Sequence, residues 1–142
     1  MQAIDAIGSA TSGISASLED LAAAAHNLAN LRTAKPTDGP AFQGEQVVHV
    51  DDPEGGVSTL VAPRGTEEGV VLSEPTHPDA DPAGLVRYPN IDIAAEMVSV
   101  VVAQRAIEAN VATIHRAVDT YRDLLAMTSS DRAQMAAASA SS

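Results

Sequence analysis

Apolar residues recur at every third or fourth position over the first thirty residues of the chain. The series runs Ile4, Ile7, Thr11, Ile14, Leu18, Leu21, Ala25 and Leu28, with Thr11 its one polar member. Steps that alternate between three and four residues are typical of a helix that packs along its whole length on another helix. The pattern therefore predicts an N-terminal coiled-coil helix over residues 1–31.

The same spacing returns near the C-terminus, over residues 92–128. Asp92 is expected to cap this helix, because its carboxylate can accept a hydrogen bond from a free first-turn N–H. Residues 129–142 are rich in Ala and Ser and are predicted to be a flexible tail, either frayed helix or disorder. The second series, of which eight members are apolar, is Met97, Val100, Gln104, Ile107, Val111, Ile114, Val118, Tyr121, Leu125 and Thr128.

Residues 32–91 have a different pattern, with short apolar runs separated by proline and glycine. The runs at 47–50, 57–61 and 69–73 indicate strands, and residues 52–56 (Asp-Pro-Glu-Gly-Gly) indicate a hairpin turn between the first two. Residues 74–90 are so rich in Pro and Asp that they are predicted to be a loop. This part is expected to form a small β/loop insert.

Together these elements predict a mainly α fold with a small β insert. The two long terminal helices are expected to form an antiparallel coiled-coil hairpin. The second helix also carries Val98, Val101, Val102 and Leu124 outside the repeat, which widens its apolar stripe beyond what a two-helix contact needs. Either the β insert or further subunits would have to cover these side chains.

The first helix contains a stretch that weakens it, residues 8–17 (GSATSGISAS). Gly8 and Gly13 each cost up to about 1 kcal/mol relative to Ala in a helix interior. One hypothesis is that the isolated helix is marginal and becomes ordered on binding its neighbours. The other is that the small residues simply permit close helix packing.

Composition restricts the partners. Eight basic and nineteen acidic residues give a formal net charge of −11, which argues against a nucleic-acid partner and an anionic membrane surface. The N-terminal residues lack the basic region and apolar run of a cleaved secretory signal, and no later stretch approaches eighteen apolar residues. No direct insertion into lipid is therefore expected.

No arrangement of residues indicates catalysis. The four histidines lack metal-ligand spacing, and the chain has no cysteine. Residues 77–81 (His-Pro-Asp-Ala-Asp) offer oxygen ligands but lack the glycine and distal glutamate of a calcium loop. We expect no enzyme activity, no cofactor and no metal site.

Two stretches resemble a known family. Residues 25–31 (AHNLANL) resemble the Ser-Asn-Leu-Ala-Asn signature of bacterial flagellar rod and hook proteins, with His26 in place of the serine. Residues 77–111 (HPDADPAGLVRYPNIDIAAEMVSVVVAQRAIEANV) resemble the segment that opens the C-terminal helix in flagellar basal-body rod proteins of the proximal-rod C type. The chain departs from that family at residues 31–36, where Leu-Arg-Thr-Ala-Lys-Pro replaces a Thr-Pro-Gly-Tyr turn.

The resemblance implies a structural subunit of the flagellar basal-body rod, exported by the flagellar export apparatus without cleavage of a signal peptide. Its implied partners are copies of itself, other rod proteins, and proteins of the basal-body rings and of the hook–basal-body junction. The implied location is the periplasm-spanning rod. A soluble coiled-coil adaptor or export chaperone is the alternative that the helical pattern leaves open.

Subunit packing is expected to use the repeat positions together with asparagines at the end of the first helix, which can bind free carbonyls there. The predicted packing residues are Ile7, Ile14, Leu18, Leu21, Asn27, Leu28, Asn30, Met97, Val100, Ile107, Asn110, Val111, Ile114, Val118, Tyr121 and Leu125.

Overall fold

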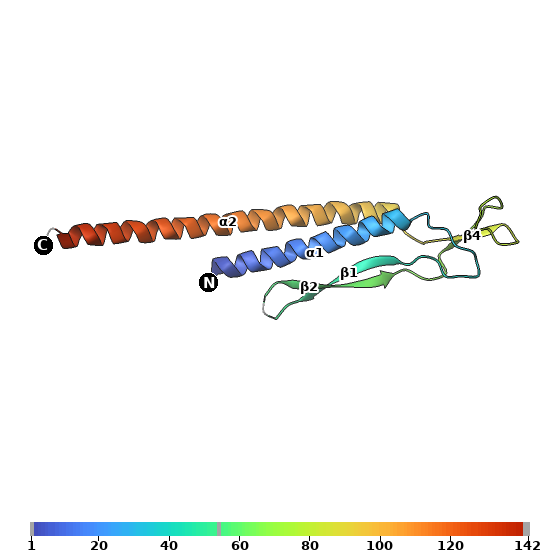
Figure 1. The fold of residues 1–142 in the computed structure, drawn as a ribbon, viewed down its shortest axis with the longest axis horizontal. Helices are drawn as coiled ribbons and strands as arrows, with labels where there is room; N and C mark the ends of the chain where they lie inside the picture. Colours follow the sequence, from blue (N-terminus) through green and yellow to red (C-terminus); the bar gives the residue numbers. More distant parts are fainter. Residues whose placement is uncertain (1, 54, 141–142) are drawn as a thin grey trace.

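The computed structural model describes residues 2–53 and 55–140. It is an elongated molecule built from two long helices with a small antiparallel β region between them in sequence (Figure 1). The mainly α fold with a β insert is thus confirmed. The elements in chain order are α1 (Gln2–Asn30), β1 (Gly44–Asp51), β2 (Val57–Arg64), β3 (Val70–Ser73), β4 (Leu85–Tyr88) and α2 (Ile93–Ala140).

The helices α1 and α2 lie side by side and run in opposite directions (Figure 1). Asn27 near the end of α1 binds Glu96 near the start of α2, and Gly13 lies against Asn110. Asn27 and Gly13 are fourteen residues apart on α1, and their partners Glu96 and Asn110 are fourteen residues apart on α2, so the antiparallel register is constant between the two contacts. Continuing that register places Gln2 opposite about residue 121, so α2 extends well beyond α1.

Small side chains form the buried part of the helix pair. The buried residues on the two helices are Ala10, Ala16, Ser17, Ala23, Ala24, Asn27, Glu96, Ala103 and Ala117. The large apolar residues of the predicted repeats flank these positions: Ile14 and Leu21 are half-buried, whereas Leu18 is 52 % exposed. Small residues allow the helix backbones to approach closely, and this leaves the larger side chains at the edges of the contact.

The predicted hairpin between the first two strands is confirmed. β1 pairs antiparallel with β2 in the register Gly44↔Arg64 to Asp51↔Val57. In the turn, Gly55 and Gly56 have φ angles of 102° and 103°, a region that residues with a side chain rarely adopt. The hairpin packs on α1, so α1 is the middle layer between α2 and the hairpin (Figure 1).

The prediction of a loop over residues 74–90 is wrong for residues 85–88. These form β4, which pairs antiparallel with β3 and buries Val86 completely. Asp81 makes the reversal possible, since its Oδ1 accepts hydrogen bonds from the backbone N–H groups of Ala83 (2.8 Å) and Leu85 (2.9 Å). The Pro- and Asp-rich residues thus build the turn that precedes a strand.

The segment after α1 joins this second sheet. The backbones of Lys35 and Arg87 exchange two hydrogen bonds of 2.9 Å each, and the Arg87 guanidinium also donates to the carbonyl of Thr37. The residues that replace the family's Thr-Pro-Gly-Tyr turn therefore run alongside β4.

Asp92 caps α2 as expected, because its Oδ1 accepts from the N–H of Ala94 at 2.8 Å. The helix continues to Ala140. Of the two predictions for the tail, helix or disorder, residues 129–140 are therefore helical. Residues 141 and 142 lie outside the described residues. The domain boundaries after residues 31, 91 and 128 remain predictions.

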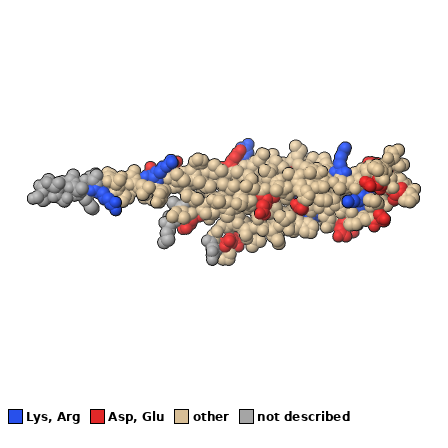
Figure 2. All heavy atoms as spheres, in the orientation of Figure 1, with Lys and Arg blue, Asp and Glu red and all other residues tan. Residues whose placement is uncertain are grey.

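Charge and hydropathy are distributed unevenly. Residues 32–91 contain ten acidic and four basic residues, and the end of the molecule that carries β3 and β4 is densely charged, unlike the long helical middle (Figure 2).

Over Ile93–Ser130, α2 is long and apolar enough to cross a membrane by length and composition alone, contrary to the sequence expectation. Alanine and valine supply this hydropathy, although the same helix holds the buried Glu96 carboxylate against α1.

Candidate functional site

Asn27, near the C-terminal end of α1, ties the helix pair to the β hairpin. Its side-chain amide is 1 % exposed and pairs with the backbone of Glu45 in both directions. Asn27 Nδ2 donates to the Glu45 carbonyl at 2.8 Å, and Asn27 Oδ1 accepts from the Glu45 N–H at 2.7 Å. The amide therefore binds β1 much as a neighbouring strand would.

Glu96 joins the same cluster from the first turns of α2. Its side chain is almost fully buried, and Oε1 accepts a hydrogen bond from Asn27 Nδ2 at 3.1 Å. The guanidinium of Arg64, at the end of β2, forms an ion pair with the same oxygen. Burying a carboxylate without such partners would be costly, so the pair and the amide together make this position tenable. We call Asn27, Glu45, Arg64 and Glu96 the polar junction.

Two histidine–carboxylate pairs flank the polar junction and also link α1 to β1. His26 Nδ1 lies 2.9 Å from Glu45 Oε2, and His49 Nε2 lies 3.0 Å from Asp20 Oδ1. These side chains are between 31 % and 46 % exposed, so solvent screens both pairs. They orient the hairpin, while the buried junction fixes it.

The glycine- and serine-rich part of α1 makes two close contacts. Ser12 Oγ accepts a hydrogen bond from the backbone N–H of Val57 at 3.1 Å, which holds the start of β2 on α1. A Cβ built on Gly13 would lie 2.8 Å from Asn110 Nδ2 of α2. Gly8 has no such neighbour within 4 Å. Close packing therefore accounts for Gly13 and leaves Gly8 unexplained.

The structure distributes the predicted packing residues over three environments. Asn27 is buried. Leu18, Met97, Val111, Tyr121 and Leu125 are exposed. The remaining ten are half-buried along the edges of the helix contact: Ile7, Ile14, Leu21, Leu28, Asn30, Val100, Ile107, Asn110, Ile114 and Val118. Asn30 donates to the carbonyl of His26 at 2.9 Å, as predicted for an asparagine at the helix end.

The β insert does not cover the surplus apolar residues of α2. Val98, Val101, Val102 and Leu124 are between 54 % and 62 % exposed, because the hairpin packs on α1 instead. Within the described residues nothing covers these four side chains, so the explanation that they pack on the β insert is wrong.

The groups with shifted pKa values lie around the β3–β4 sheet. A hydrogen bond from Thr37 lowers the pKa of Asp81, and one from Thr66 lowers that of Glu68. The bond that Tyr88 donates to Glu74 (2.9 Å) raises the pKa of the tyrosine. Two of these bonds, Thr37–Asp81 and Tyr88–Glu74, join segments that are distant in sequence.

Among residues 2–53 and 55–140, no group of three or more His, Asp or Glu side chains is arranged to hold a metal ion. In the stretch that resembled a cation loop, His77 Nδ1 accepts from the N–H of Asp79 at 3.0 Å, and Asp81 caps its own turn. The side chains of this stretch therefore serve the fold.

Sequence reasoning identified Asn27 as a packing residue but missed Arg64 and the role of Glu96. Both Asn27 and Glu96 lie in the stretches that carried the family resemblance, which was the available signal. Arg64 lies at a strand end with no recognisable pattern around it. Only the β1–β2 register brings it to the helices.

Comparisons with known proteins all find flagellar basal-body rod proteins. Residues 83–127 match the family described as flagellar basal body rod FlgEFG protein C-terminal. The flagellar basal-body rod protein FlgC of Salmonella typhimurium strain LT2 is 32 % identical over 113 residues, covering 75 % of this chain and 83 % of that protein. FlgC of Escherichia coli O157:H7 is also 32 % identical, over 111 residues with the same coverage.

FlgC of Borreliella burgdorferi matches over a longer span, 26 % identical over 149 residues, covering 89 % of this chain and 98 % of that protein. Because that match covers 89 % of this chain, it includes most of the two helices and of the insert between them. The chain therefore belongs to the FlgC family of flagellar basal-body rod proteins.

Proposed function

We propose that this chain is a structural subunit of the proximal part of the flagellar basal-body rod, and that it polymerises with other rod proteins into the axial drive shaft for motility. The 32 % identity to FlgC of Salmonella typhimurium, over 75 % of this chain, carries the proposal. A shaft transmits torque through interlocking surfaces, so its subunits need large packing faces and no catalytic centre. We accordingly propose no enzymatic role and no cofactor.

The surface of the helix pair supports this role. Met97, Val98, Val101 and Val102 are each at least 54 % exposed on α2. Fully burying such a side chain is worth about 1.5–3 kcal/mol, so leaving a row of them in water forfeits much of the stability of a small domain. Neighbouring subunits would recover this free energy on assembly.

The proposed neighbours are copies of this chain, other rod proteins, and proteins of the basal-body rings and the hook–basal-body junction. The proposed route is export through the flagellar apparatus without signal cleavage, into a rod that spans the periplasm. Direct insertion of α2 into lipid is not part of this proposal. A helix that anchors the polar junction would have to leave Arg64 and Asn27 to enter a bilayer.

Fractionation distinguishes this proposal from a soluble coiled-coil adaptor or export chaperone. A rod subunit co-purifies with basal bodies extracted in detergent, at a level comparable with other rod proteins. An adaptor or chaperone stays in the cytoplasmic fraction. Recovery of the chain only from the cytoplasm of flagellated cells would contradict the proposal.

A further inference from the structure

The strand β3 forms an outer edge of the second sheet, because the described residues pair it only with β4. The direction of the backbone groups on β4 is set by its other neighbours. Arg87 exchanges two backbone hydrogen bonds with Lys35, while the N–H and the carbonyl of Leu85 bind the side chain and the N–H of Asp81. The backbone groups of Arg87 and Leu85 therefore point away from β3.

The residues opposite these two on β3 must point outward as well. Val71 faces Arg87, and Ser73 faces Leu85. In an antiparallel ladder, facing residues that exchange no hydrogen bonds both direct their N–H and C=O groups away from each other's strand. Within residues 2–53 and 55–140, no group binds the backbone of Val71 or Ser73 from the outer side. The free edge of β3 thus presents two donors and two acceptors.

The side chains of β3 do not protect this edge. Val70, Val71 and Leu72 are each at least 40 % exposed. Natural strand edges are commonly protected by lysine, proline or a bulge, because an unprotected edge pairs readily with another chain. The sequence of β3 is Val-Val-Leu-Ser, which contains neither lysine nor proline and favours extended structure.

The edges of the β1–β2 hairpin are partly blocked by comparison. On β1, the side chain of Asn27 binds both backbone groups of Glu45. On β2, the outward N–H of Val57 is bound by Ser12, and Pro63, which lies opposite Glu45, brings no N–H to that edge. β3 has no such protection along its length.

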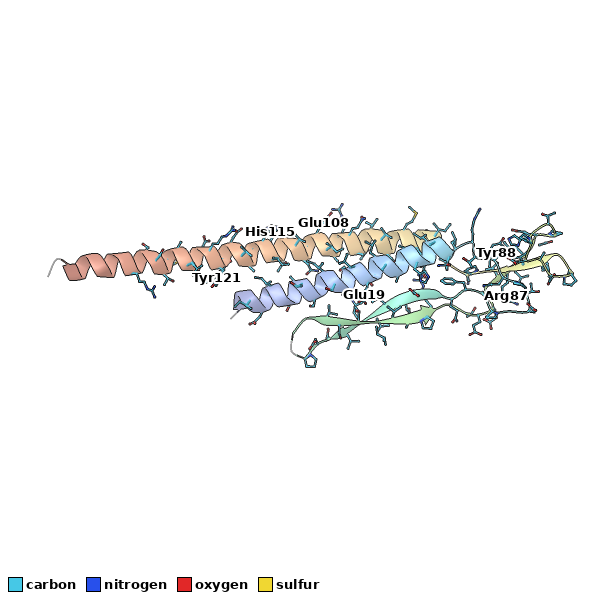
Figure 3. The ribbon with its side chains drawn as sticks, viewed as in Figure 1. Glu19, Arg87, Tyr88, Glu108, His115 and Tyr121 are labelled. Carbon is cyan, nitrogen blue, oxygen red and sulfur yellow. The ribbon has the colours of Figure 1, made fainter. Side chains whose placement is uncertain are left out.

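Negative charge surrounds the β3 edge. Residues 65–90 contain five acidic residues and one basic residue, Arg87, whose guanidinium donates to backbone carbonyls (Figure 3). Glu67 and Glu68 precede β3 and are exposed, and Glu74 follows it. Among the described residues, no Lys or Arg forms an ion pair with any of these three carboxylates. A second copy of β3 would bring the same negative charge, so opposite charge must come from a different chain.

We propose that the β3 edge binds an extended, basic segment of a partner protein, which adds to the β3–β4 sheet as a further strand. Main-chain hydrogen bonds to Val71 and Ser73 hold the segment, and lysine or arginine near its ends meets Glu67 and Glu74. Strand addition of this kind takes its affinity from main-chain bonds and its specificity from side chains. The inference goes beyond the proposed function and does not depend on it, since the helices contribute nothing to this surface.

Binding of a synthetic peptide to the full-length chain tests the edge. The probe is acetyl-Lys-Val-Thr-Val-Lys-amide, and NMR follows the amide signals of Val71 and Ser73 during the titration. One control peptide has glutamate in place of both lysines, and a second has N-methylated valines, which cannot donate main-chain hydrogen bonds. The lysine peptide is expected to shift both amide signals and to bind about tenfold more tightly than either control, because each control loses two of the proposed interactions.

Val71→Pro removes the outward N–H of β3 without removing a ladder bond to β4, so its affinity for the lysine peptide should fall about tenfold. Val71→Ala is the matched control, since it keeps the N–H and should bind within about threefold of the unsubstituted chain. The amide of Val86, which lies inside the β3–β4 ladder, reports whether each variant is folded.

The charge of the edge is tested without proline. Glu67→Gln combined with Glu74→Gln leaves the backbone intact. It should weaken binding of the lysine peptide several-fold at low salt and make the remaining affinity less sensitive to salt. An affinity and a salt dependence equal to those of the unsubstituted chain would contradict the basic character of the partner.

Equal binding of the lysine peptide and either control peptide would overturn the proposal, as would full affinity in a folded Val71→Pro chain. The absence of binding would overturn it too, and so would a Val86 amide that exchanges freely in the unsubstituted chain, because the edge would then not be preformed. If the signals of Val71 and Ser73 shift with protein concentration in the absence of peptide, the occupant is a second copy and the proposal is wrong. These outcomes leave the rod function untouched, which fractionation tests separately.

Discussion

At the scale of single residues, the amide of Asn27 is matched to its surroundings in a way that few side chains could reproduce. It presents one acceptor to the N–H of Glu45 and donors to the Glu45 carbonyl and to Glu96. Aspartate has the size but lacks the donors, and it would add a second negative charge beside Glu96. An asparagine in the rod-type signature at this position thus has a physical reason in this chain.

Asn27→Ala is expected to lower the free energy of unfolding by about 2–3 kcal/mol, because it leaves buried backbone groups and the Glu96 carboxylate with one partner fewer. Urea denaturation followed by circular dichroism measures the change. Asn30→Ala is the matched control: its amide binds at the exposed helix end, and a loss below about 1 kcal/mol is expected. Equal losses in the two variants would show that burial of Asn27 contributes nothing special.

The two glycines of α1 are expected to respond differently to alanine. At Gly8 a new Cβ has open space around it, so Gly8→Ala should raise the free energy of unfolding of the isolated chain by up to about 1 kcal/mol. Its helicity and melting temperature should rise as well. Gly13→Ala must push the Asn110 side chain aside, which offsets that gain. Circular dichroism of the purified variants measures both, and a larger gain for Gly13→Ala would refute the close-packing explanation.

The unsubstituted chain tests the other hypothesis for this stretch, namely that α1 is marginal until neighbours complete it. Circular dichroism of the purified monomer should then show low helicity and a broad melting transition. A highly helical monomer that melts cooperatively would contradict it. In that case Gly8 would need a reason other than delayed ordering.

At the scale of elements, the Asp81 turn connects β3 to β4 and depends on the charge of one carboxylate. Thr37 and the backbone N–H groups of Leu85 and Ala83 donate to it, which holds its pKa below the usual value for Asp. A pKa that is lower in the folded chain means that ionisation favours the turn. That contribution is fully present above about pH 4, the ordinary pKa of Asp, and is lost as the pH falls through the folded value.

Amide hydrogen exchange measures this dependence at Ala83 and Leu85. Protection of the two amides is expected to stay constant from neutral pH to about pH 4, after allowance for the intrinsic exchange rate, and to fall below that. Asp81→Asn keeps an acceptor oxygen, so it should weaken the protection at neutral pH and remove most of its dependence on acid. A wild-type turn that is equally protected at every pH would rule out this role for the carboxylate.

The elements differ in how far the sequence could predict them. Both helices could be predicted from their apolar periodicity, and the start of α2 from the Asp92 cap, because these signals depend only on residues that are near in sequence. The strand at Leu85–Tyr88 was missed, since its pairing depends on a turn that Asp81 closes and on Lys35, about fifty residues away. Likewise, the repeat identified which stripe of each helix is apolar but not that Ala10 and Ala103 are buried.

At the scale of the whole molecule, the chain has two kinds of packing surface, one that holds its own elements together and one that is exposed. The polar junction and the small buried residues of α1 fix one chain internally. The larger apolar residues of α2 point outward along much of the helix, where a subunit of a shaft would meet its neighbours. A substitution on the outward surface should therefore spare the folding of the chain and disrupt assembly.

Val111→Asp tests this division, because Val111 is 39 % exposed in the single chain. The variant is expected to be produced at normal levels yet to abolish rod assembly and swimming, since contact with a neighbour would bury an unpaired charge. Thr113→Asp, an exposed position two residues along the same helix, adds the same charge on another face and should swim. Leu21→Asp should also abolish motility, although Leu21 is half-buried and its loss could act through the fold. Normal swimming both of cells that carry Val111→Asp and of cells that carry Leu21→Asp would mean that these apolar positions do not form the working contacts of the rod.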